Sequence, residues 1–212
     1  MKWLVTLTEW LQTQLGMSRE RRLVMFESIK LIKKGIEKSR LYASFFEWHD
    51  RDREEKGVVE SLQESLQKNQ QEFFENIRSR GRGNDPPDCE ADLISGGQVA
   101  IEVTELVSGE AIRCAKHGYL VHAVYTESDL IKRVNDGLVT KGGKRSNLKG
   151  GPYKQYVVVI YTNEHQISFE WASTVFSDQK FCCPNIDKAF LLISYYPCLK
   201  MYPYVELKLE SH

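Results

Sequence analysis

The 212-residue chain has few of the features that mark membrane, secreted or strongly basic proteins. No apolar run approaches the ~20 residues that span a bilayer, so we expect no membrane partner. The five cysteines are odd in number and contain no C-x-x-C pair, which argues against a disulfide framework and a zinc site. We therefore expect reduced thiols and a cytoplasmic protein. Lys and Arg number 29, as do Asp and Glu, so any contact with nucleic acid must come from local basic patches.

The chain also lacks the motifs of several common enzymes. It has neither the G-x-x-x-x-G-K-[ST] spacing of a phosphate-binding loop nor the G-x-S-x-G element of many serine hydrolases. Its five histidines show no metal-ligand spacing. The acidic residues are therefore the main candidates for chemistry.

The segment 86–105 has the alternation of apolar and polar residues that is typical of a β-hairpin. A two-residue loop at 96–97 would mix apolar and polar side chains on each face. A three-residue loop that includes Gln98 pairs Leu93 with Ile101 and separates the two kinds, so we predict this register. One face then carries Cys89, Ala91, Leu93, Ile101 and Val103, and the other carries Asp88, Glu90, Asp92, Glu102 and Thr104.

The second face of this hairpin holds four carboxylates. In the predicted register Asp92 lies opposite Glu102, and like charges directly opposite repel each other. A hard divalent cation such as Mg²⁺ or Mn²⁺ would neutralise them, and such a site can activate water. The alternative is the polar outer face of an ordinary antiparallel sheet.

The first third of the chain has the apolar spacing of amphipathic helices. The helices that it predicts cover residues 3–15, 23–36, 41–48 and 57–77, with a charged connector over 50–56. We therefore divide the chain into an N-terminal helical region, 1–56, which caps the core, and an α/β domain, 57–212. The alternative role for the first region is a surface for a homodimer.

The remainder of the chain reads as strands alternating with helices. Continuous apolar runs predict buried strands at 157–161 and 189–193, and clean alternation predicts an edge strand at 204–210. Ser128 is a candidate cap for one helix, and 167–176 predicts another. These elements predict an α/β protein with a mixed central sheet flanked by helices.

Pro87-Asp88, followed after thirteen residues by Glu102-Val103-Thr104, resembles the PD-(D/E)XK nuclease superfamily, which has the restriction-endonuclease-like fold. The core of that superfamily is helix, three strands, helix, strand, and residues 57 to about 162 match this order. The resemblance implies that Asp88 and Glu102 bind Mg²⁺ or Mn²⁺. It also implies metal-dependent hydrolysis of phosphodiester bonds in nucleic acid, DNA in preference to RNA.

The chain departs from the superfamily pattern at Thr104, because this position usually holds a lysine. In some branches the lysine lies on the following helix, and Lys141 is our candidate for this displaced partner. Glu90 is a candidate third metal ligand, since it shares the acidic face with Asp88. The alternative is a catalytically inactive fold that acts as a nucleic-acid-binding or protein-interaction module.

Two basic segments are candidates for contact with nucleic acid: one immediately precedes the predicted hairpin, and the other is a predicted glycine- and lysine-rich loop over residues 141–154. Both contain glycines, which let a backbone approach phosphate groups closely. The alternative for both is an exposed connector. The candidate nucleic-acid-binding residues are Arg78, Arg80 and Arg82 in the first segment, and Lys144, Arg145 and Lys149 in the second.

Overall fold

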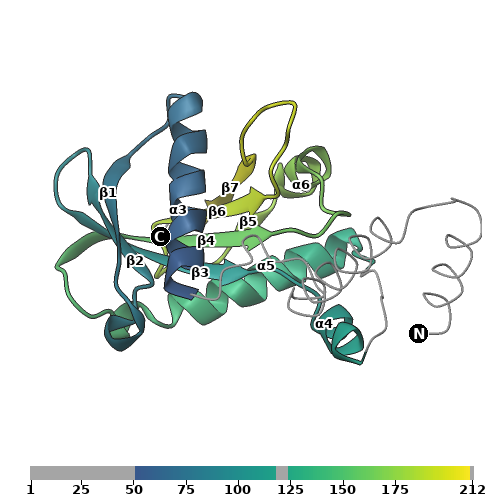
Figure 1. The fold of residues 1–212 in the computed structure, drawn as a ribbon, viewed down its shortest axis with the longest axis horizontal. Helices are drawn as coiled ribbons and strands as arrows, with labels where there is room; N and C mark the ends of the chain where they lie inside the picture. The colour runs from purple at the N-terminus through teal and green to yellow at the C-terminus, as the bar shows by residue number, and fades with distance from the viewer. Residues whose placement is uncertain (1–50, 118–123, 211–212) are drawn as a thin grey trace, which may run out of the picture. The chain divides into compact units, whose positions relative to one another are not determined.

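The computed structural model describes residues 51–117 and 124–210 (Figure 1). The chain divides into two compact units, 1–41 and 42–212, and all described residues belong to the second. The helices predicted within 3–48, and with them the capping or dimerising role of this region, lie outside the described residues. Within 51–117 and 124–210, no helix combines the length and the apolar character that a membrane span requires.

A mixed seven-stranded sheet forms the centre of the fold, in the order β1-β2-β3-β4-β6-β7-β5. Neighbouring strands are antiparallel in the pairs β1–β2, β2–β3 and β6–β7, and parallel in β3–β4, β4–β6 and β5–β7. The predicted α/β class is thereby confirmed. The strands are β1 Phe74–Ser79, β2 Cys89–Leu93, β3 Gln98–Glu105, β4 Tyr153–Thr162, β5 Lys180–Phe181, β6 Lys188–Ile193 and β7 Tyr204–Leu209.

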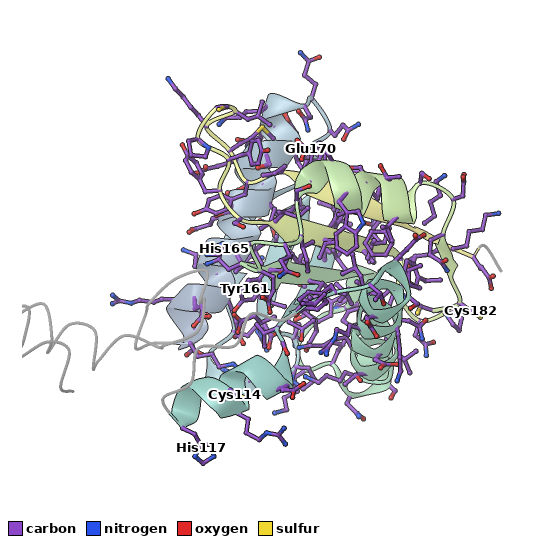
Figure 2. The ribbon with its side chains drawn as sticks, turned by 90° about the vertical axis from the view of Figure 1, so that its right-hand side faces the viewer. Cys114, His117, Tyr161, His165, Glu170 and Cys182 are labelled. Atoms are coloured by element: carbon purple, nitrogen blue, oxygen red, sulfur yellow. The ribbon has the colours of Figure 1, made fainter. Side chains whose placement is uncertain are left out.

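Helices cover both faces of the sheet. Figure 2 shows α3 on one side, with α5 and α6 on the other. Strand β4 contributes to both cores, because Val157 and Val159 pack with α3 while Val158 and Ile160 pack with α5 and α6. The helices are α3 Arg51–Lys68, α4 Gly109–Lys116, α5 Glu127–Gly142 and α6 Phe169–Phe176, with 3-10 turns η1 Arg82–Asn84 and η2 Arg145–Asn147.

Helix α3 differs from its prediction at both ends. It begins at Arg51, so the predicted charged connector is helical and the boundary proposed at residue 56 falls inside the helix. It ends at Lys68 rather than near Ile77, and Gln70 has a positive φ of 57° in the turn that follows. The residues after this turn form β1, whose Phe74 is buried in the core shared with α3.

The hairpin β2–β3 has the predicted faces but a different register. Ile101 pairs with Cys89 rather than with Leu93, four positions along β2. The loop is longer than predicted: it spans 94–97, and the Leu93 N–H donates to the Gly97 carbonyl at 2.8 Å. An even shift leaves each side chain on its own face. The predicted apolar face is accordingly buried with α3.

The change of register decides which acids meet. Asp92 pairs with Gln98, so the prediction that it faces Glu102 was wrong. Extending the observed register by one residue beyond the pair Cys89–Ile101 places Asp88 opposite Glu102. The two acids that the resemblance singles out therefore lie next to each other on neighbouring chain segments.

The remaining elements follow their predictions with two corrections. The buried strands β4 and β6 and the helix α6 lie where the apolar runs predict them. The cap of α5 is Thr126 and not Ser128, since the Thr126 hydroxyl accepts from the Asp129 N–H at 3.2 Å. Strand β7 is not an edge strand along its whole length, because β5 pairs with its last residues.

Candidate functional site

Three acidic residues converge at the start of β2 and the middle of β3. Asp85 follows η1, Asp88 directly precedes β2, and Glu102 lies within β3. One carboxylate oxygen from each lies within 4.8 Å of the others. The Val103 N–H donates to Oδ2 of Asp88 at 2.7 Å, which fixes this carboxylate against β3. The backbone of β3 therefore holds the Asp88 carboxylate next to Glu102.

Glu102 is fully buried, which is unusual for a charged residue. Its Oε2 accepts from the ammonium groups of Lys141 and, at 3.1 Å, Lys144. The Lys141 ammonium also donates to Oδ2 of Asp88 at 3.3 Å. The second oxygen of Glu102, Oε1, is buried and has no hydrogen-bond partner among the described residues. Oε2 thus accepts hydrogen bonds from the two lysines, whereas Oε1 is free to accept one.

Lys141 reaches the acids because α5 extends further than the sequence predicts. The predicted glycine- and lysine-rich loop begins at Lys141, but the helix continues through Gly142. The last turn is anchored by the Tyr156 hydroxyl, which donates to the Lys141 carbonyl at 2.7 Å. Leu138 packs in the core one turn earlier. The helix therefore delivers the Lys141 ammonium to Asp88 and Glu102.

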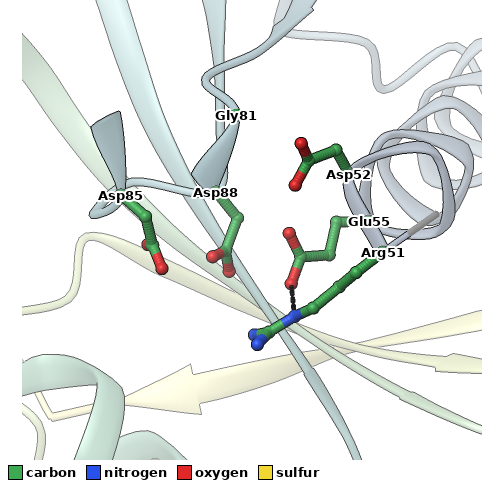
Figure 3. Close-up of a pocket in the computed structure, with 6 residues that line it drawn as sticks. All are labelled: Arg51, Asp52, Glu55, Gly81, Asp85 and Asp88. Carbon is green, nitrogen blue, oxygen red and sulfur yellow. Dashed lines mark hydrogen bonds and ion pairs between the residues drawn. The ribbon is translucent and has the colours of Figure 1, made fainter. Parts of the chain in front are cut away.

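A cleft of about 410 Å³ opens beside the acidic cluster. Figure 3 shows Asp85 and Asp88 on its sheet side, facing Glu55 of α3 across the gap. The Arg51 side chain donates to Oε1 of Glu55 at 2.6 Å. Burial, together with the charge of Asp88, raises the pKa of Glu55 to about 7, although Arg51 partly opposes this rise. The cleft thus gathers carboxylates from two layers of the fold.

Sequence reasoning missed two of the acids around this cleft. Asp85 stands three residues before Asp88, but in the sequence it reads as the end of a flexible basic loop. Glu55 lies three and four residues before Val58 and Val59, which are both buried. This spacing places Glu55 on the inward face of α3 and would have identified it had the helix been extended to Arg51. Glu60 and Glu64, two other acids of this helix, are exposed.

The other two acids of the hairpin face lie away from the cluster, in a network of arginines. Glu90 accepts from Arg78 and Arg80, each at 3.2 Å, and from the Tyr153 hydroxyl at 3.0 Å. Asp92 accepts from Arg78 at 2.8 and 3.0 Å, and this hydrogen bonding holds the pKa of Asp92 below its usual range. The structure therefore groups Asp85, and not Glu90, with the two predicted metal ligands.

Thr104 does not join the acidic cluster either. It lies beside α5 at Gly137 and lines a separate cavity of about 230 Å³, together with Arg133 and Ile160. The Thr104 side chain therefore packs against α5. The lysine that contacts Asp88 and Glu102 is Lys141, which comes from α5.

The residues predicted to bind nucleic acid have different surroundings. Lys144 contacts Glu102, and Arg145 pairs with Asp187 at 2.9 Å. The Lys149 N–H donates to the Pro86 carbonyl at 2.8 Å, which fastens its loop beside the acids. Arg78 and Arg80 are paired with Glu90, as described above, and the side chain of Arg82 lies outside the described part. Of the six, Lys144 is the residue that the structure brings to the acidic cluster.

No cysteine or histidine site competes with the acidic cluster in the described ranges. Cys114 lies on α4 and His117 directly follows this helix, and both are well separated from Cys182 (Figure 2). In residues 51–117 and 124–210, the acidic trio is the one group of three or more such ligands close enough to hold a metal ion. The oxygen-only donor set favours a hard cation over zinc or copper.

A scan against models of known protein families finds no match to this chain, and searches of curated proteins and of solved structures find none either. The geometry of the site is therefore what the functional argument depends on. The superfamily resemblance remains a prediction from the sequence.

Proposed function

We propose that this protein hydrolyses phosphodiester bonds of nucleic acid, DNA in preference to RNA, with Mg²⁺ or Mn²⁺ held by Asp85, Asp88 and Glu102. The observation that carries the proposal is the free oxygen of Glu102. A fully buried carboxylate oxygen without a hydrogen-bond partner in the described structure is costly. It lies beside two further carboxylates, where a cation would satisfy it.

The donor set fits a hard divalent ion. Mg²⁺ and Mn²⁺ prefer carboxylate oxygens and retain several waters, and the neighbouring cleft has room for those waters and for a phosphate group. Oδ1 of Asp85 is also buried and lacks a partner in the part of the chain described. A bound cation would lower the pKa of a coordinated water and withdraw charge from a phosphate.

Other residues of the chain supply the positive charges and the cleft wall that such a reaction also requires. Lys141 and Lys144 place two positive charges beside Glu102, where the negative charge of a phosphate under attack would be stabilised. Glu55 and Arg51 form the opposite wall of the cleft. The succession α3, β1, β2, β3, α4, α5, β4 resembles the superfamily order of a helix, three strands, a helix and a strand, with the short helix α4 as an addition before α5.

A second candidate function is a nucleic-acid-binding or protein-interaction module without catalysis. One observation favours it: the Lys141 ammonium already bridges Asp88 and Glu102 and offsets their charge without a metal. Under this alternative the lysines and acids form a structural ion cluster. Such a protein would bind nucleic acid in a salt-sensitive manner without cutting it.

Cleavage of supercoiled plasmid by the purified full chain, with Mg²⁺, with Mn²⁺ and with EDTA, tests the proposal. We expect cutting only with metal and its loss, by at least about 100-fold, in Asp88→Asn and Glu102→Gln. Glu60→Gln is the matched control, because Glu60 is an exposed acid on α3. Cutting that persists in both site variants would refute the proposal.

Calorimetric titration with Mn²⁺ separates the two candidate functions. Nuclease function predicts binding that Asp88→Asn and Glu102→Gln abolish and Glu60→Gln retains. Absence of Mn²⁺ binding by the wild-type chain, with salt-sensitive binding of DNA and no cleavage, would favour the non-catalytic module.

A further inference from the structure

Two lysines from the end of α5 share one oxygen of Glu102, but their surroundings differ. The Lys141 side chain is 8% exposed and contacts both Asp88 and Glu102. The Lys144 side chain is 37% exposed and contacts Oε2 of Glu102 at 3.1 Å. Lys141 belongs to the helix, whereas Lys144 follows its end at Gly142.

Lys141 is poorly placed to leave the acids. If its ammonium moved toward a substrate, Oδ2 of Asp88 and Oε2 of Glu102 would both lose a buried counter-charge, which is strongly unfavourable. Its backbone is fixed as well, because the Tyr156 hydroxyl donates to its carbonyl. By occupying Oε2 of Glu102, Lys141 leaves Oε1 as the oxygen without a partner. Its contacts therefore set the orientation of the two carboxylates.

Lys144 has the freedom that Lys141 lacks. Its removal from Glu102 leaves the Lys141 contact in place, and a third of its side chain already faces solvent. The Lys144 ammonium can therefore exchange one anionic partner for another.

We propose that the two lysines divide the work of the site: Lys144 binds the phosphate group of the substrate, and Lys141 is a positioning residue that orients Asp88 and Glu102 for the cation. This division rests on the proposed phosphodiesterase function. It assigns substrate binding to Lys144, two residues beyond the end of α5 at Gly142, and not to Lys141 within the helix.

The first test measures binding of a fluorescein-labelled DNA duplex by anisotropy, in Ca²⁺ and in EDTA, over a series of salt concentrations. We expect Lys144→Met to reduce the dependence of log K on log salt by about one unit and Lys144→Arg to restore it. Lys141→Met should keep the wild-type slope. Lys132→Met is the matched control, since Lys132 is an exposed lysine of the same helix. A wild-type slope in Lys144→Met, or a lost slope in Lys141→Met, would overturn the division.

The second test measures Mn²⁺ affinity by calorimetry in the same variants. Loss of a residue that orients a metal ligand typically weakens metal binding 10- to 100-fold, so we expect a weakening of about 10-fold or more in Lys141→Met. Lys141→Arg should recover part of it, and Lys144→Met should stay within about threefold of wild type. Equal effects of the two lysines on Mn²⁺ affinity would contradict the proposal.

Neither test uses cleavage, so a wild-type chain that binds DNA and Mn²⁺ but does not cut DNA would refute the proposed function and leave the division standing. A wild-type chain that binds no DNA would refute the role of Lys144. If Lys141→Met does not fold, the DNA-binding slope of Lys144→Met decides the outcome.

Discussion

Glu102 occupies a strand position at which neighbouring side chains are apolar and buried. Val103 and Ile101 on either side pack into the core with α3, while the Glu102 carboxylate turns to the opposite face and meets two lysines. A buried carboxylate of this kind destabilises a fold unless charged partners compensate it. The two lysines supply this compensation at Oε2, while Oε1 has no partner among the described residues. Glu55 lies across the cleft, and its raised pKa should make the stability of the protein depend on pH.

Glu55→Gln should stabilise the protein at neutral and alkaline pH. The pKa of Glu55 is raised to about 7 in the folded chain, so the folded state binds a proton that the unfolded state releases at lower pH. The free energy of unfolding of the wild type consequently falls as pH rises from about 4.5 to about 7, whereas the glutamine side chain has no proton to lose in this range. In EDTA, urea denaturation should show a gap that widens over this range to about 1–3 kcal/mol in favour of the variant.

The exposed Glu60→Gln variant is the control for this pH dependence, and it should follow the wild-type curve. A gap between Glu55→Gln and wild type that stays constant from pH 5 to pH 8 would show that the Glu55 carboxyl does not take up a proton in the folded state.

At the scale of elements, the sequence pattern predicts where most strands lie but not how they meet. The faces of the β2–β3 hairpin follow from alternation alone, because parity survives an even shift of register. The register itself depends on the loop, which has four residues where the alternation pattern predicts three. The sequence predicts α3 to run too far, because Phe73 and Ile77 continue its apolar spacing although the chain turns after Lys68. Local spacing cannot reveal such a turn when the following strand is also apolar.

The cap of α5 provides a test of the element that delivers Lys141. Thr126 and Asp129 form a reciprocal pair, in which each side chain accepts from the backbone N–H of the other. Thr126→Ala removes half of this pair and should lower the free energy of unfolding by about 1 kcal/mol. Ser128→Ala, at the position that the sequence suggests as the cap, should change it by less than about 0.5 kcal/mol. Urea denaturation of the two variants decides between the positions, and a larger loss in Ser128→Ala would contradict the observed cap.

At the scale of the whole molecule, the site joins segments that no local pattern connects. Asp85 and Asp88 come from the approach to β2, Glu102 from β3, Lys141 from α5, and Glu55 from the opposite layer. The pair 88 and 102 could be predicted from the superfamily resemblance, whereas the predicted hairpin register placed Asp92 opposite Glu102. Helical spacing could have placed Glu55 on the inward face of α3, but its approach to Asp88 depends on how α3 packs across the sheet. A ligand at this point would tie the layers together and should therefore stabilise the entire fold.

Binding of Mn²⁺ should raise the melting temperature of the full chain. A ligand that binds only the folded state adds about 2.7 kcal/mol at one hundred times its Kd, which for a protein of this size corresponds to a rise of about 5–10 °C. Glu102→Gln removes a charged ligand and should lose most of this rise, while Glu60→Gln should keep it. Differential scanning calorimetry with Mn²⁺ and with EDTA measures the effect. An equal rise in Glu102→Gln would place the stabilising ion elsewhere in the chain, because a cation at this cluster must bind less tightly once Oε1 belongs to a neutral amide.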